Sequence, residues 1–217
     1  MVDGSVVKSL ARTSARRGRF PTPETGATDE RTPLRLAVGD VVVYGLHGVA
    51  LIAASEGDAA APTAVVLEFA SGLRVTLPSA RARESLRSLA DESELARVEE
   101  TLGADESAGE AQWTKRFRAS REKVVAGQLI GLAEVVRDGA RREHRQALRS
   151  GPKPSPAERA LYVQARRLLA EEVGAVRGID LPTADKWISE QIDATIEAQA
   201  NEPPGVASRR RRGKADG

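Results

Sequence analysis

The sequence predicts an α+β protein in which a small N-terminal antiparallel β-barrel is followed by a C-terminal all-α helical bundle. Residues 35–78 contain short β-branched runs separated by glycine-rich turns. Residues 79–200 instead place apolar residues at helical spacing. The spacing of apolar residues changes from strand-like to helical once, after Pro78. The strands and the helices are therefore expected to form consecutive parts of the chain.

Four short strands account for the first part. They share β-branched or alternating residues and are Val41–Tyr44, Val49–Ala54, Ala64–Phe69 and Leu73–Leu77. Gly45–Gly48 and Ser71-Gly72 are read as turns because glycine tolerates positive φ, and Glu56–Pro62 is read as a break. A barrel of this size has little room for a buried active site, which favours a docking module.

Helices account for the second part. The expected segments are an apolar-periodic stretch from Leu86 to Val98, Trp113–Gln128, Leu129–Leu148, a helix after Ser155 and a helix after Leu181-Pro182-Thr183. Ser155, Pro156 and Glu158 form the pattern of an N-cap, a first-turn proline and a capping box. The resulting organisation is a disordered extension 1–34, a β-module 35–89, a helical domain 90–202 and a basic disordered tail 203–217.

Composition excludes several classes of function. The 217 residues contain no cysteine and only two histidines, so thiol catalysis, disulfides and histidine-rich metal sites are ruled out. His47 lies in a glycine-flanked turn and His144 lies among arginines, and the sequence has no phosphate-binding glycine loop. We therefore expect no enzyme, no cofactor and no metal site. No segment is long and apolar enough to span a membrane, and a cytoplasmic, nucleoid-associated monomer is expected.

Charge is distributed unevenly although the formal net charge is only +2. Residues 113–167 carry 14 Lys and Arg against five acidic residues, and acidic segments flank this basic block. The block fits a surface that faces phosphates, and it equally fits solvated helix faces that pair with the acidic segments.

The segment Trp113-Thr114-Lys115-Arg116-Phe117-Arg118 carries the main candidate site. Cations beside a large flat ring suit DNA, because the cations neutralise phosphates while the ring stacks on or wedges against a base step. In the alternative, Trp113 shares an apolar stripe with Phe117 and belongs to the core.

Several motifs together resemble the CarD/CdnL family of bacterial transcription regulators. The N-terminal motif is Val38-Gly39-Asp40-Val41-Val42-Val43-Tyr44 followed by His47-Gly48-Val49, in a module shared with the transcription-repair coupling factor. Later motifs are the Trp113–Arg118 segment, Ala133–Asp138 (AEVVRD), Ser155–Arg159 and Ala165-Arg166. Their order and spacing agree over residues 36–198.

This resemblance implies a Tudor-like barrel that docks on the RNA polymerase β subunit and a helical domain that contacts promoter DNA. Trp113 matches the family's minor-groove wedge, which stabilises the open complex. The matching DNA-binding cations are Lys115, Arg116, Arg118 and Arg159. The positions that match the polymerase-docking surface are Asp58, Arg74 and Thr76.

The chain departs from the family pattern on the docking module. Gly45 stands where the family has proline, and no Lys or Arg occurs between Leu36 and Leu73. Two hypotheses therefore remain at this point. The chain is a polymerase-binding regulator that stabilises the open complex, or a divergent paralogue that binds DNA non-specifically without docking on polymerase.

Overall fold

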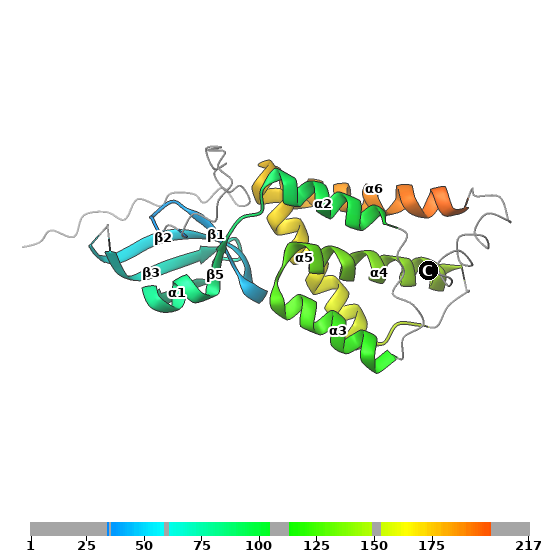
Figure 1. Ribbon diagram of the computed structural model, residues 1–217, viewed down its shortest axis with the longest axis horizontal. Coiled ribbons are helices and arrows are strands. Elements are labelled where there is room, and N and C mark those ends of the chain that lie inside the picture. Colours follow the sequence, from blue (N-terminus) through cyan, green and yellow to red (C-terminus); the bar gives the residue numbers. More distant parts are fainter. Residues whose placement is uncertain (1–33, 35, 59–60, 105–112, 149–152, 201–217) are drawn as a thin grey trace, which may run out of the picture.

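The computed structural model describes residues 34, 36–58, 61–104, 113–148 and 153–200. The elements at the sheet end are β1 (Val41–Tyr44), η1 (Gly45–His47), β2 (Gly48–Asp58), β3 (Ala61–Phe69), β4 (Arg74–Pro78), α1 (Ser79–Ser85) and β5 (Leu86–Ser88). The helices that follow are α2 (Glu92–Gly103), α3 (Trp113–Ala126), α4 (Leu129–Ala147), α5 (Pro156–Arg177) and α6 (Leu181–Ala200). The molecule is elongated, with the sheet at one end and helices α2–α6 at the other (Figure 1).

The strands form one antiparallel sheet in the order β4-β3-β2-β1-β5. The sheet is open, because β4 and β5 are its two edges and do not pair with each other among the described residues. The α+β class is therefore confirmed, whereas closure into a small barrel is not observed. The predicted break at Glu56–Pro62 is also wrong, since β2 continues to Asp58 and β3 begins at Ala61.

One face of the sheet is covered by α1. The buried residues of this core include Val42, Ile52, Leu67 and Ala82 of α1. The Ser79 hydroxyl donates a hydrogen bond to the Pro62 carbonyl and holds the first turn of α1 on β3. The helical period expected directly after Pro78 is thus interrupted, because Leu86 ends the helix and starts β5, which pairs with β1. Pairing with a distant strand outweighs the local pattern here.

The predicted terminal extensions fall mainly outside the described residues. Of residues 1–34 only Leu34 is described, and it packs against the sheet core instead of lying free. The tail 203–217, with the Arg209–Arg212 run, lies wholly outside the described part.

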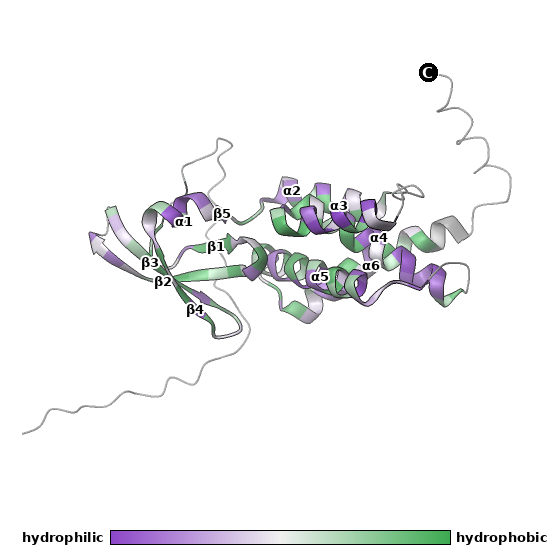
Figure 2. Ribbon diagram, turned by 90° about the horizontal axis from the view of Figure 1, so that it is seen from below, coloured by the Kyte–Doolittle hydropathy of each residue, from purple (hydrophilic) through white to green (hydrophobic). Residues whose placement is uncertain are grey.

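Helices α2–α6 pack around a second core, whose largest fully buried members include Leu95, Leu132, Leu169 and Ile188. Hydrophobic and hydrophilic stretches alternate along these helices, as expected where each helix buries one face (Figure 2). The capping box predicted at Ser155 and Glu158 is present at the start of α5, with Pro156 in the first turn. The helix predicted over Trp113–Gln128 ends two residues early, at Ala126, because Gly127 adopts φ 62° and turns the chain into α4.

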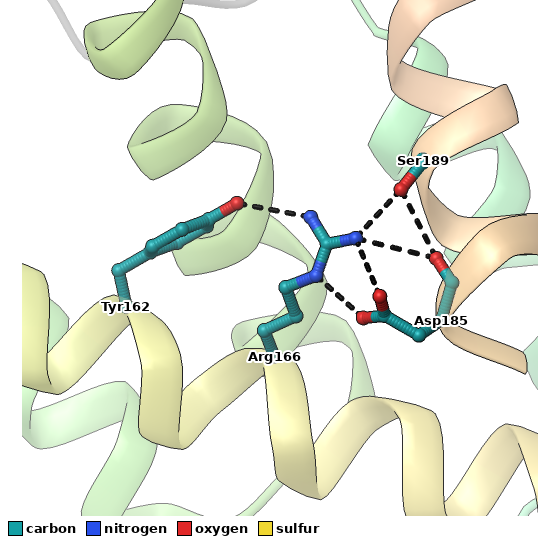
Figure 3. Close-up of polar contacts among 4 residues, drawn as sticks. All are labelled: Tyr162, Arg166, Asp185 and Ser189. Atoms are coloured by element: carbon teal, nitrogen blue, oxygen red, sulfur yellow. Dashed lines mark hydrogen bonds and ion pairs between the residues drawn. The ribbon is translucent and has the colours of Figure 1, made fainter. Parts of the chain in front are cut away.

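A guanidinium holds α5 against α6. Arg166 donates to both carboxylate oxygens of Asp185, at 2.5 and 3.0 Å, to the Ser189 hydroxyl at 2.6 Å and to the Tyr162 hydroxyl at 3.0 Å (Figure 3). The Asp185 carboxylate, acting against the effect of burial, raises the pKa of Arg166 further above its ordinary value. The hydrogen bond from Arg166 to the Tyr162 hydroxyl holds the Tyr162 ring of α5 against α4.

Tyr162 leads to a stability prediction at Gly139 of α4. A Cβ at this position would lie 2.3 Å from Cδ2 of the Tyr162 ring, which the Arg166 network prevents from moving away. We expect Gly139→Ala to lower the free energy of unfolding by about 1–3 kcal/mol through overpacking. Chemical denaturation monitored by far-ultraviolet circular dichroism measures this change.

The matched control is Gly131→Ala on the same helix. Its Cβ would lie 3.4 Å from Cβ of Lys123, an ordinary contact. Because alanine is the better helix former, this variant should keep its stability or gain up to about 1 kcal/mol. Equal effects of the two substitutions would contradict the close Gly139–Tyr162 contact.

Candidate nucleic-acid interface

The start of α3, the end of α4 and the start of α5 meet at the end of the bundle away from the sheet (Figure 1). Side chains from all three helices line a small crevice there, namely Arg116, Phe117 and Ser120 of α3, Val135 and Arg142 of α4, and Glu158, Leu161 and Tyr162 of α5. The candidate DNA-contacting tryptophan, Trp113, is the first residue of α3 at this end.

Trp113 is exposed rather than buried in the core. Its relative exposure is 44%. The alternative in which Trp113 and Phe117 form a buried apolar stripe would require a much lower value. The indole stacks on Phe117, one helical turn away, with ring centroids 5.5 Å apart and planes 6° from parallel. The stack supports one face of the indole and leaves part of it accessible for a flat partner.

Glu158 connects Trp113 to the start of α5. Its side chain accepts from the Ser155 backbone N–H at 2.9 Å, and it also receives a hydrogen bond from the Trp113 side chain. Burial alone would raise the pKa of Glu158, but these hydrogen bonds and the charge of Arg142 outweigh it and place the pKa below the ordinary glutamate value. Glu158 is therefore a carboxylate that caps α5 and holds the indole at once.

Cations surround this carboxylate. Arg142 is partly buried, and burial is the main cause that lowers its pKa. The nearby Glu158 and Asp138 carboxylates oppose this effect, and repulsion from Arg116 and Arg145 adds to it. Arg159 lies on α5 with its side chain 58% exposed and its Nε 3.7 Å from a Glu143 carboxylate oxygen. An arginine keeps its charge in such surroundings, so the bundle end is a cationic surface.

The predicted DNA-binding residues divide into two groups. Trp113, Arg116 and Arg159 lie at the bundle end, together with Arg142 and Arg145, which the motif comparison did not single out. Their signal in the sequence was the excess of positive charge in residues 113–167. Lys115 and Arg118 lie on the outer face of α3, where Arg118 pairs with Glu122 at 2.9 Å.

The predicted docking residues are also divided. Arg74 and Thr76 lie on the edge strand β4 and are exposed, and Nε of Arg74 is 3.6 Å from a Glu68 carboxylate oxygen. Asp58 pairs in register with Ala61, whereas Arg74 pairs with Glu68 at the other end of β3. The structure therefore brings Arg74 and Thr76 together and leaves Asp58 at a distance.

Backbone groups at Arg74 and Thr76 face the open edge of the sheet. The Phe69 N–H donates to the Leu73 carbonyl at 2.9 Å, so these two residues form a hydrogen-bonded pair between β3 and β4. In an antiparallel ladder such pairs alternate with pairs whose N–H and C=O groups point away from the partner strand. Arg74 and Thr76 occupy those alternate positions, and no described strand pairs with them from outside.

The remaining candidate side chain is His47. His47 is exposed and stacks on Tyr44 at a centroid distance of 5.0 Å, which fits its expected place in the turn. Within the described ranges no cluster of histidine and acidic residues could hold a metal ion. No described helix has the length and apolar character that crossing a membrane requires.

Comparison with known proteins matches the chain to two family domains and to a curated relative. Residues 36–90 match the CarD-like/TRCF RID domain, and residues 97–189 match the C-terminal domain of CarD. The chain is also 26% identical over 147 residues to a Bacillus subtilis (strain 168) protein named "Putative transcription factor YdeB". This alignment covers 65% of the chain and 92% of the relative.

The lowered pKa of Glu158 predicts how the Trp113 site responds to acid. A carboxylate with a depressed folded pKa stabilises its contacts fully above the ordinary glutamate pKa and loses this effect as the pH falls through the depressed value. With Trp187→Phe, Trp113 becomes the only tryptophan. Its fluorescence should therefore change at a pH below the ordinary glutamate pKa while circular dichroism reports a folded chain.

Glu158→Gln in the same background is the control. The amide keeps the size of the side chain but does not titrate, so the fluorescence transition should disappear. An unchanged transition would show that another group controls the Trp113 environment.

Proposed function

Because the chain belongs to the CarD/CdnL family of bacterial transcription regulators, we propose that it binds the RNA polymerase β subunit and upstream promoter DNA together and thereby stabilises the open complex. In this proposal residues 35–89 are the polymerase-interacting module and residues 90–202 are the DNA-binding helical domain. The observation that carries it is the exposed Trp113, stacked on Phe117 at the cationic end of the bundle.

The chemistry of the bundle end supports the proposed DNA contact. Arg116 and Arg159 neutralise phosphates, and Lys115 and Arg118 extend the positive charge along the outer face of α3. The indole of Trp113 occupies a distorted base step at the edge of the melted region. Hydrogen bonding to Glu158 and stacking on Phe117 restrict the indole beforehand, so little conformational entropy is lost on binding.

The open edge of β4 supports the proposed polymerase contact. Outward-facing backbone groups at Arg74 and Thr76 can accept one further strand, which gives affinity through main-chain hydrogen bonds. This mode requires few basic side chains, in agreement with the lack of Lys and Arg between Leu36 and Leu73. Asp58, at the far end of β2, would contribute at the rim of such a contact.

The mechanism is a shift of an equilibrium, and no bond is made or broken. Polymerase binding raises the effective concentration of the bundle beside the promoter. Because Trp113 contacts only melted or distorted DNA, the protein binds the open form better than the closed form and prolongs its lifetime.

One observation favours the alternative of a non-specific DNA-binding paralogue. Arg74, a cation on the proposed docking strand β4, has its Nε 3.6 Å from a Glu68 carboxylate oxygen, so part of its charge is neutralised within the sheet. A protein of this kind would bind DNA with strong salt dependence and little sequence preference, and its binding would not depend on polymerase.

The proposal predicts a separation of effects at Trp113. Trp113→Ala should shorten the open-complex lifetime by about tenfold, since base–aromatic stacking contributes about 1–3 kcal/mol, while polymerase affinity stays unchanged. Filter retention of complexes after heparin challenge measures the lifetime. Trp113→Phe keeps an aromatic ring and should retain part of the effect. A Trp113→Ala variant with the native lifetime would contradict the proposal.

Strand pairing at β4 predicts that two substitutions of Thr76 will differ in their effect on polymerase affinity. Thr76→Pro removes the outward N–H of an edge strand without removing a hydrogen bond to β3, and we expect about tenfold weaker binding to polymerase. Thr76→Val keeps the N–H and should bind as the native protein does. Surface plasmon resonance against the polymerase β subunit measures both. Equal affinities would exclude pairing at β4, whereas no measurable binding by the native protein would favour the alternative.

A further inference from the structure

The sheet and the bundle meet at a junction of three elements: β5, α5 and the Gly127 turn between α3 and α4. Arg87 of β5 donates from Nη1 to Oε1 of Glu172 at 2.5 Å and from Nη2 to Oε2 at 2.7 Å. The same Nη2 donates to the Gly127 carbonyl at 2.8 Å. One guanidinium therefore binds groups from the sheet side, from α5 and from the α3–α4 turn.

Glu172 lies in the interior of this junction. Its relative exposure is 1%, and its Oε1 also accepts the backbone N–H of Ala90 at 3.1 Å. Ala90 lies in the short link between β5 and α2, the segment that joins the two parts of the molecule. The carboxylate thus holds both the last strand of the sheet and the connecting chain against α5.

Close backbone contacts surround this ion pair. A Cβ at Gly48 would lie 2.1 Å from Oε2 of Glu171, and a Cβ at Gly127 would lie 3.5 Å from Cα of Gly45. The Glu171 carboxylate accepts from the Val49 backbone, while burial raises its pKa above the ordinary value. Val43 and Val49 pack with Ala175 of α5 in a small buried cluster. Sliding of the sheet on α5 would break these contacts.

A buried ion pair of this kind constrains the relative orientation of the elements it joins more than it adds net stability. Taking both charges out of water offsets most of their attraction, and apolar residues of similar size are often equally stable. The planar guanidinium, however, binds a carboxylate in one plane and at one angle. The function of Arg87 and Glu172 therefore lies in the relative orientation of the elements that they join.

We propose that Arg87 and Glu172 are positioning residues that fix the angle between the sheet and the bundle, so that a partner held at β4 places Trp113 at one point on the DNA. This inference rests on the proposed function. A fixed angle matters because the second contact benefits from the first only where geometry allows both at once.

The first experiment measures the angle in the free protein. The chain has no cysteine, so Ala80→Cys in α1 and Ala119→Cys in α3, both exposed, accept spin labels at two defined points. Double electron–electron resonance should give one narrow distance distribution in the otherwise native full chain. In the Arg87→Met/Glu172→Met variant we expect a melting temperature close to native and a clearly broader distribution.

The second experiment measures function in the same variants without labels. Arg87→Met/Glu172→Met should keep its affinity for polymerase and for DNA separately, and it should shorten the open-complex lifetime by about tenfold. The matched control is Arg166→Met/Asp185→Met, which replaces an arginine–carboxylate pair inside the bundle. The control should retain the narrow distribution and the native lifetime.

A distribution as narrow as the native one, or an unchanged open-complex lifetime, in Arg87→Met/Glu172→Met overturns the inference. If this variant does not fold, both measurements are made on Arg87→Lys, because lysine keeps the positive charge and loses the planar guanidinium. A broader distribution and a shorter lifetime then support the inference, and native values of either overturn it. A native protein with no effect on open complexes contradicts the proposed function instead, and the distance measurement still tests the fixed angle by itself.

Discussion

The contact between the Arg87 guanidinium and the Glu172 carboxylate is the interaction on which the arrangement of the whole molecule depends. It joins the last strand of the sheet to α5, and through the Gly127 carbonyl it also reaches the α3–α4 turn. The two large cores do not merge, and the small Val43–Val49–Ala175 cluster lies between them. Because so little apolar surface is shared, a directional polar contact decides how the sheet and the bundle are oriented.

A half-buried carboxylate and two buried arginines also orient helices elsewhere in the bundle. Glu158 caps α5 and holds the Trp113 indole, so the position of the exposed ring follows from the position of a helix end. Arg137 and Arg141 of α4 are buried and donate to the Thr101 and Ala104 carbonyls at the end of α2. These inward-facing charges organise the helices, while other cations stay at the surface where a polyanion can reach them.

This division suits a regulator that acts by binding. Within the described ranges no cluster of histidine and acidic residues could hold a metal ion, and the family matches point to transcription factors. The two candidate contact surfaces, the β4 edge and the end of the bundle where α3 begins, belong to opposite parts of an elongated molecule (Figure 2). In the proposed function such a protein acts through the distance and angle between its contacts, and this is the role that we assign to Arg87 and Glu172 at the junction.

Local patterns in the sequence determined the α+β class, the starts of α3, α4 and α5, and the Ser155–Glu158 capping box, because each depends on residues within a few positions of one another. The tertiary structure alone decided that Leu86–Ser88 is a strand, that the sheet stays open, and that Trp113 is exposed. It also decided that Glu172 is buried. Its partner Arg87 is 85 residues away along the chain, and a local sequence pattern cannot predict which distant charge will pair with a carboxylate in the interior.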